Sequence, residues 1–127
     1  MPVRSEIRLR LPNSPGALSG VCRTLADQRV QVLALSLDAG GQLRLIVDSH
    51  SRAAAALQAA HHRTSEALVL VTTVPHAVGG VAFLLRQIAD AGINVEYAYA
   101  AASEEGATAL LVIGVEDPVR AADIAGL

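Results

Sequence analysis

The sequence predicts an α+β fold made of two similar repeats of about 60 residues each. The segment PNSPG at residues 12–16 returns as PHAVG at residues 75–79, with Pro and Gly at the same places. Each segment precedes apolar residues spaced i, i+3, i+4 and i+7, which is typical of one face of a helix. These apolar residues are Leu18, Val21, Cys22 and Leu25 in the first repeat and Val81, Leu84, Leu85 and Ile88 in the second. Because loop and stripe recur at one offset, we infer an internal duplication.

The first repeat is predicted to alternate strands and helices. Charged and apolar residues alternate over residues 6–11, which is typical of a half-buried strand. The pair Gly40–Gly41 favours a hairpin turn between two later strands, because glycine tolerates positive φ. Ser51 is expected to cap the second helix. The expected elements are a strand at 6–11, a helix at 17–28, strands at 30–38 and 43–47, and a helix at 53–60.

The second repeat is expected to begin inside one long extended segment, residues 64–74. This segment is too long for one strand of a small sheet. We therefore divide it near Glu66 into the last strand of the first repeat and the first strand of the second. A helix closed by Gly92 follows, then two strands and a helix that starts at Asp117–Pro118. The expected elements are a helix at 81–91 and strands at 93–101 and 107–115.

Each repeat therefore has the order β-α-β-β-α-β of the ferredoxin-like split βαβ fold, with an antiparallel sheet and two helices on one face. We expect the first repeat at residues 1–66 and the second at residues 67–127. The second repeat stops in or just after its second helix, so it lacks its last strand. A missing strand leaves a neighbouring strand with an unpaired edge, which another chain can fill.

The composition argues against several classes of function. Aromatic residues make up 2% of the chain, tryptophan is absent and the net charge is −2, which speaks against a nucleic-acid-binding surface. The single cysteine, Cys22, cannot form an internal disulfide or a CxxC motif, and it fits a reducing cytoplasm. Residues 67–85 are uncharged but are interrupted by Pro75, His76 and Gly79–Gly80, so no membrane span is expected. The N-terminus does not have the pattern of a signal peptide.

The loop before the first helix is the leading candidate for a binding site. Its backbone amides lie at a helix N-terminus, where N–H groups without intrahelical partners favour a carboxylate or another anion. Asn13 and Ser14 offer hydrogen bonds, and Gly16 allows a ligand to come close to the backbone. The same residues also make a good turn and helix start without any ligand, so both readings stay open at this point.

The segment LPNSPGALSGVCRTLADQRVQVLAL resembles the opening of an ACT domain, in which an N-x-P-G-x-L loop precedes a helix and a strand. The segment VPHAVGGVAFLLRQIADAGINVEYAYA is similar to a second ACT unit with its AGIN turn. The resemblance covers nearly the whole chain and implies a stand-alone tandem ACT protein without an attached enzyme. Such a module is expected to bind an amino acid or a similar small ligand at interfaces between paired units. A regulated metabolic enzyme is then the implied partner.

The resemblance implies ligand-facing positions in both repeats. They are Asn13, Ser14, Gly16, Ala17 and Leu18 in the first repeat, and His76, Gly79, Gly80, Val81 and Asn94 in the second. The second loop departs from the family pattern, since His76 stands where the family usually has Asn and Val78 where it usually has Pro. One functional and one degenerate site would fit these departures. Arg29 replaces the glycine of the AGIN turn, so that turn is expected to be less typical.

No residue pattern indicates an enzyme, a cofactor or a metal site. The motifs of serine hydrolases, zinc peptidases and nucleotide-binding loops are absent from the sequence. Cys22 lies on the helical stripe and is expected in the core. His61–His62 is expected to end a helix rather than bind a metal. Glu104–Glu105 is expected at a solvated hairpin tip.

Two tyrosines lie on the strand expected at residues 93–101. Tyr97 and Tyr99 are predicted to share a strand face with Ile93 and Val95. Core packing is one reading for the tyrosines, and lining an interface or a ligand pocket is the other.

Apolar residues on both faces of several strands predict that the open face of the sheet is covered. Leu33, Leu35 and Leu37 are expected on the helix-free face, and residues 67–71 and 110–113 are apolar on both faces. A large bare apolar patch is rare on a monomer, so we expect a homodimer or a higher oligomer.

Three functions fit the sequence, and a fold does not choose among them. The first is a small-molecule sensor that binds an amino acid and changes the packing of its paired units. The second is a structural or protein-interaction module without a small ligand. The third and weakest is an enzyme of ferredoxin-like fold.

Overall fold

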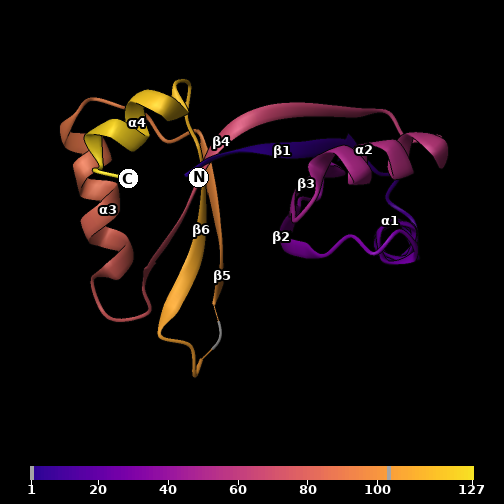
Figure 1. Ribbon diagram of the computed structural model, residues 1–127, viewed down its shortest axis with the longest axis horizontal. Coiled ribbons are helices and arrows are strands. Elements are labelled where there is room, and N and C mark those ends of the chain that lie inside the picture. The colour runs from indigo at the N-terminus through magenta and orange to yellow at the C-terminus, as the bar shows by residue number, and fades with distance from the viewer. Residues whose placement is uncertain (1, 103) are drawn as a thin grey trace. The chain divides into compact units, whose positions relative to one another are not determined.

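The computed structural model describes residues 2–102 and 104–127. The elements in chain order are β1 (Val3–Arg10), α1 (Ala17–Asp27), β2 (Val32–Leu37), β3 (Gln42–Val47), α2 (His50–Ala59), β4 (Thr64–Pro75), α3 (Gly80–Asp90), β5 (Tyr97–Ala102), β6 (Thr108–Gly114) and α4 (Pro118–Ile124) (Figure 1). This order confirms the predicted α+β class with ferredoxin-like repeats. Helices α1, α3 and α4 begin within two residues of their predicted starts.

The chain divides into two compact units. The N-terminal unit consists of Ser5–Ala67, and the C-terminal unit consists of residues 2–4 and Leu68–Leu127. Hydrogen-bonded strands follow the order β2-β3-β1-β4-β6-β5, so β1 and β4 give residues to both units. The strand order is therefore β2-β3-β1-β4 within the N-terminal unit and β1-β4-β6-β5 within the C-terminal unit. Each unit has two helices of its own.

The core of the N-terminal unit lies between its two helices and one face of its strands. Val21 and Leu25 are one helical turn apart on α1, and both are fully buried. Cys22, the third residue of the predicted stripe, is only half-buried. The buried residues of this core are Ile7, Leu9, Leu11, Val21, Leu25, Val30, Leu43, Leu45, Val47, Ala53 and Leu57.

Strand β2 does not place its leucines as predicted. Leu35 lies opposite Leu45, which belongs to the core, and residues that lie opposite each other on neighbouring strands share a face. Leu35, and Leu37 two residues later, therefore lie on the helix-covered face instead of the helix-free face. The cause is a register shift within residues 32–34, around Leu33, because an extra residue inverts the alternation beyond it.

The C-terminal unit repeats the plan with α3 and α4. Helix α3 is followed by Gly92 in the left-handed conformation, with φ 75°, as predicted for a residue just after a helix. Asp117 is the N-cap of α4, and its carboxylate accepts a hydrogen bond from the backbone N–H of Arg120 at 3.1 Å. The buried residues of this core are Leu70, Val74, Leu84, Ile88, Ala109, Leu111, Ile113, Val115, Ala121 and Ala122.

The start of the chain lies beside β4, at the place where a fourth strand of the second repeat would pair. Helix α4 is the last element in the described part of the chain. The N–H of Val71 in β4 donates a hydrogen bond to the carbonyl of Pro2 at 2.6 Å, and residues 2–4 belong to this unit. The edge of β4 that the sequence analysis left open is therefore occupied by the beginning of β1.

Two details of the expected elements are wrong. Residues 64–74 were expected to form two strands, but β4 runs unbroken over Thr64–Pro75, and the two compact units meet within it, between Ala67 and Leu68. The strand is long because its first residues belong to one unit and its last residues to the other. The N-cap of α2 is Ser49 and not Ser51, and the Ser49 side chain makes no capping hydrogen bond.

The two tyrosines of β5 lie on the helix-free face of the C-terminal unit. Ala98, between them, lies opposite a core residue of β6, so Tyr97 and Tyr99 point the other way. Their rings are stacked, with centroids 6.5 Å apart. The face predicted for them with Ile93 and Val95 is wrong, because β5 begins only at Tyr97 and the two earlier residues pack against the core.

Arg29 takes the left-handed conformation that the sequence analysis did not expect of it. Its φ is 55°, and Gly92, at the equivalent place in the second repeat, has a φ of 75°. Both residues close a helix in the same way. The N–H of Arg29 donates to the carbonyl of Ala26 at 2.9 Å, and that of Gly92 to the carbonyl of Ala89 at 2.9 Å. The two turns match, although a Cβ in this conformation costs about 1–2 kcal/mol.

Candidate functional site

The residues predicted for the first binding loop line one depression in the N-terminal unit. The depression has a volume of about 310 Å³. All five predicted residues belong to its lining, which consists of Leu11, Pro12, Asn13, Ser14, Gly16, Ala17, Leu18, Ser19, Leu37, Asp38, Ala39 and Gly41. The structure therefore brings the first loop together and adds a second wall from the β2–β3 hairpin.

Gly16 gives the first loop its shape. It is the N-cap of α1 with a φ of 83°, in the left-handed region where a side chain is strained. No side chain caps this helix start. The first N–H groups of a helix have no intrahelical acceptor. The depression thus meets an uncapped helix N-terminus, which favours a negatively charged group.

The β2–β3 hairpin lies next to the loop that precedes α1, because the N–H of Leu11 donates a hydrogen bond to the carbonyl of Gly41 at 2.8 Å. Gly41 has a φ of 88°, and a Cβ at this position would lie 2.4 Å from the Leu11 carbonyl oxygen. The Asp38 carboxylate accepts a hydrogen bond from the N–H of Gln42 at 3.1 Å, which holds this exposed side chain at the hairpin. The depression therefore combines an anion-favouring helix start with a carboxylate.

Sequence reasoning missed Asp38 and Leu37 as parts of this site. The hairpin turn itself was predicted, but its place beside the loop depends on the pairing of β1 with β3, in which Arg10 lies opposite Gln42. That pairing joins residues far apart in the chain. Only the β-α-β-β order, in which the end of one strand meets the start of the third, could have pointed to it.

The second loop is built alike but is tighter. Gly79 is the N-cap of α3 with a φ of 86° and no side-chain cap. The backbone N–H of His76 donates to a carbonyl of the β5–β6 hairpin at 3.0 Å, and its side chain is exposed. A Cβ on Gly80 would lie 2.1 Å from the carbonyl oxygen of Pro75. The first repeat has Ala17 at the place of Gly80, so the two loops offer different room for a ligand.

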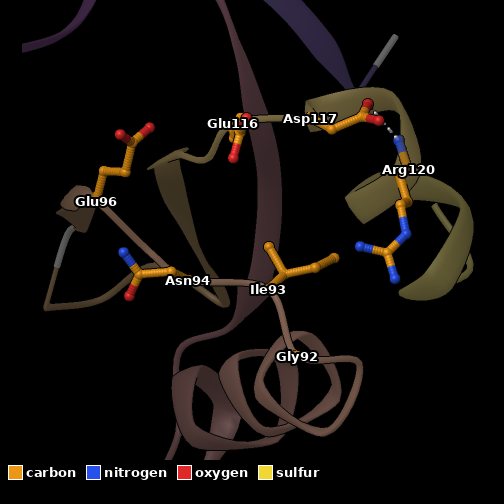
Figure 2. A pocket seen from close by; sticks show the side chains of 7 residues that line it. All are labelled: Gly92, Ile93, Asn94, Glu96, Glu116, Asp117 and Arg120. Carbon is orange, nitrogen blue, oxygen red and sulfur yellow. Dashed lines mark hydrogen bonds between the residues drawn. The ribbon is translucent and has the colours of Figure 1, made fainter.

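Asn94 lies apart from the other residues predicted for the second repeat. It lines a depression of about 570 Å³ where α3 ends and α4 begins, shown in Figure 2. The lining residues are Gly92, Ile93, Asn94, Glu96, Glu116, Asp117 and Arg120. This lining does not include His76, Gly79, Gly80 or Val81. The structure therefore does not bring the predicted residues of the second repeat into one site.

Acidic side chains dominate the depression beside Asn94. Glu96, Glu116 and Asp117 are all exposed, and Figure 2 shows Glu96 at one end and Arg120 at the other. The Arg120 guanidinium donates to the carbonyl of Ala91 at 3.4 Å, at the end of α3. Three carboxylates repel the carboxylate of an amino acid, so this depression suits such a ligand less well than the first one.

The remaining candidates lie away from both depressions. Among the described residues, no three His, Cys, Asp or Glu side chains come together as a metal site would require. His61, with a φ of 70°, lies just after the end of α2. Glu104–Glu105 forms an exposed turn between β5 and β6, as predicted. The described helices are all too short or too polar to cross a membrane.

Comparison with solved structures shows proteins of the same architecture. Protein BT0572 from Bacteroides thetaiotaomicron is 25% identical, with a TM-score of 0.89 over 98% of this chain and 88% of that one. The ligand-free regulatory subunit of aspartate kinase from Thermus thermophilus is 21% identical, with a TM-score of 0.71 over 97% and 90% of the two chains. Aspartokinase III from E. coli, in complex with lysine and aspartate, is 14% identical, with a TM-score of 0.61 over 97% of this chain and 31% of the kinase.

The sequence itself matches no family model and no curated protein. Several of the neighbours are regulatory subunits or domains of aspartate kinases, and 90% of one such subunit is covered by the match to this chain. Together with the two βαββ units and their shared strands, these likenesses identify the fold. The chain has the tandem ferredoxin-like fold of the aspartate kinase regulatory subunits.

Proposed function

We propose that this chain is a regulatory module that binds an amino acid, or a similar small ligand, in the depression of the N-terminal unit. The observation that carries the proposal is that the predicted loop residues and the β2–β3 hairpin line one depression of about 310 Å³. These residues are Asn13, Ser14, Gly16, Ala17 and Leu18 in the loop and Asp38, Ala39 and Gly41 in the hairpin. The fold neighbours support it, because they are regulatory and one of them was solved with lysine and aspartate bound. A metabolic enzyme is the regulated partner that we propose.

The charges of the depression are complementary to a zwitterion. The N–H groups of Leu18 and Ser19, at the uncapped start of α1, can donate to the α-carboxylate of the ligand. The Asp38 carboxylate can accept from its α-ammonium group. Asn13 and Ser14 can each donate and accept hydrogen bonds, so they can select a polar ligand side chain.

The ligand is held, in this proposal, where units from two copies of the chain pair. Asn13, Ser14 and Gly16 are exposed, so the depression of a single unit leaves much of a ligand in contact with water. A second unit placed over the depression would bury the ligand. Contacts with the ligand would in turn hold that unit in place. The ligand shifts the packing of the paired units only by its different affinity for the two arrangements.

If an amino acid binds in this depression, it should raise the melting temperature of the protein selectively. In a thermal-shift screen with the twenty common amino acids at millimolar concentration, one of them or a small related group should stabilise the protein by mass action. Asn13→Ala should weaken the binding about ten-fold, since one buried hydrogen bond of about 1.4 kcal/mol is lost. Gly16→Val should abolish it, because valine cannot hold the φ of 83°.

Asn94→Ala is the matched control for this screen. Asn94 is an exposed asparagine in the other unit and lines the acidic depression, so its loss should leave the shift intact. A protein whose melting temperature is unmoved by every amino acid, or a shift that survives Gly16→Val, would contradict the proposed site.

A homodimer or higher oligomer is the second part of the proposal. Sedimentation across micromolar concentrations should show a species larger than one chain, and the ligand should change the association constant if it binds between units. A strict monomer at every concentration, with and without ligand, would rule out a site formed by paired copies.

A protein-interaction module is the second candidate, and one observation favours it. Val78 in the second loop is fully exposed at 107%, and Phe83 on α3 is 70% exposed. Large apolar side chains in water near a loop that is tight for a ligand are typical of a contact surface. This reading predicts no amino-acid shift, together with weaker binding of the partner enzyme by Phe83→Ser.

A further inference from the structure

We infer that the N-terminal unit carries a second, separate binding site, which takes a phosphate group on the helix-free face of its strands. A depression of about 270 Å³ lies there. It is lined by Arg8, Leu9, Arg10, Gln42, Arg63, Thr64 and Ser65, all from Ser5–Ala67. Three of these seven lining residues are arginines. None of the seven is Asp or Glu, and all seven lie in a segment that the structure describes in full.

The fold gathers these arginines from opposite ends of the N-terminal unit. Leu9 is buried in the core, so Arg8 and Arg10, its neighbours on β1, point to the other face of the sheet. Gln42 lies opposite Arg10 in the β1–β3 ladder and therefore shares that face. Arg63 immediately precedes β4, the other neighbour of β1. The positive groups therefore converge across three adjacent strands.

The arginines are held in place by the protein. The Nε of Arg8 donates to Glu6 at 2.9 Å, and the Nε of Arg44 lies 4.0 Å from the same carboxylate oxygen. The Nη1 of Arg10 donates to the carbonyl of Gly40 at 2.6 Å. A guanidinium has five N–H donors, so the bond to Gly40 orients the Arg10 group and still leaves donors of Arg10 for a ligand. The lining itself holds three arginines and neither Asp nor Glu, so its net charge is positive.

The chemistry of the lining fits a tetrahedral oxyanion. Guanidinium groups form paired, charge-assisted hydrogen bonds with phosphate oxygens. Ser65, whose side chain is exposed, adds a hydroxyl donor to the lining. The small volume suits free phosphate or the terminal phosphate of a small metabolite.

The test is a titration of the intact chain with inorganic phosphate, followed by calorimetry and by melting temperature at constant ionic strength. Phosphate should raise the melting temperature by about 3 °C or more when saturating, whereas sodium chloride at the same ionic strength should not. Arg63→Gln should weaken phosphate binding about ten-fold, because one charge-assisted contact is lost. Arg63 is exposed, so this variant should fold normally.

Arg23→Gln is the matched control, since Arg23 is an exposed arginine of α1 in the same unit and does not line the depression. It should bind phosphate as the wild type does. Titrations with sugar phosphates and nucleoside monophosphates distinguish free phosphate from a phosphorylated metabolite as the ligand. Affinity equal to that of inorganic phosphate points to free phosphate, and tighter binding points to a phosphorylated metabolite.

Two results would overturn the inference. One is a phosphate effect that chloride reproduces, and the other is equal binding by wild type and Arg63→Gln. Asn13→Ala keeps this test separate from the amino-acid site, because it should weaken amino-acid binding and leave the phosphate shift unchanged.

Discussion

Gly80→Ala is expected to destabilise the protein by about 2–3 kcal/mol, a large loss for a single added methyl group. The Cβ would lie 2.1 Å from the carbonyl oxygen of Pro75 and 3.1 Å from its carbonyl carbon. Both are backbone atoms at the end of β4, so relief requires the helix start or the strand to move. Urea unfolding monitored by circular dichroism measures the change in the free energy of unfolding.

Gly20→Ala is the control for this substitution. Gly20 also lies in the first turns of a helix, α1, but an added Cβ would meet nothing within 4 Å beyond its own chain neighbours and the nearby backbone of the helix. Alanine is a better helix former than glycine, so this variant should be about 0.5–1 kcal/mol more stable than the wild type. Equal stability of Gly80→Ala and wild type would show that the second loop has room for a side chain, as the first loop does with Ala17.

Glu6→Ala is expected to cost about 2–3 kcal/mol of stability. The Glu6 side chain is 0% exposed, accepts from Arg8 at 2.9 Å and lies 4.0 Å from Arg44. Removal of the carboxylate leaves two arginines close together without their common counter-charge, and such breaking of a buried pair costs about 3–5 kcal/mol. The expected cost is lower here, because the side chains of Arg8 and Arg44 are 31% and 22% exposed.

Glu66→Ala separates this effect from a general loss of negative charge. Glu66 is exposed on β4 in the same unit, so its removal should change the free energy of unfolding by less than about 0.5 kcal/mol. Urea denaturation of both variants at low and high salt is the measurement. Equal stability of Glu6→Ala and Glu66→Ala would mean that the Glu6 ion pairs contribute nothing.

Local patterns predicted most of the helices and the duplicated plan. The apolar stripes of α1 and α3 follow from the helical period alone, and Val21, Leu25, Leu84 and Ile88 are buried as that period requires. Gly92 and Asp117 mark their helix ends correctly, because capping depends on a few neighbouring residues.

Features that depend on partner strands were predicted poorly. The register shift in residues 32–34 turns Leu35 and Leu37 to the helix-covered face, and no residue in β2 signals it. Residues 64–74 were expected to form two strands, because the sequence does not show that the last strand of one unit continues without a break into the first strand of the next. Arg29 adopts a positive φ because the helix end requires it, against its own preference.

The candidate site was likewise predicted where its pattern is local and missed where it depends on strand pairing. Residues 13–18 were found from the sequence because a loop with glycine before a helix is a local pattern, and all of the predicted members line one depression. Asp38 was missed because it joins that loop only through the β1–β3 ladder. Asn94 was grouped with the second loop by resemblance, but it lies in a different depression.

The sequence by itself determined the α+β class, the two repeats, the helix stripes and the first loop, since these depend on residues within one or two turns of each other. Only the tertiary structure decided which strands are shared between the units, how the start of the chain completes the second unit, and which distant residues meet the first loop and the arginines of β1. The physical reason is that strand pairing and register join residues far apart in the chain, so they are selected by the packing of the whole sheet and its core rather than by local preference.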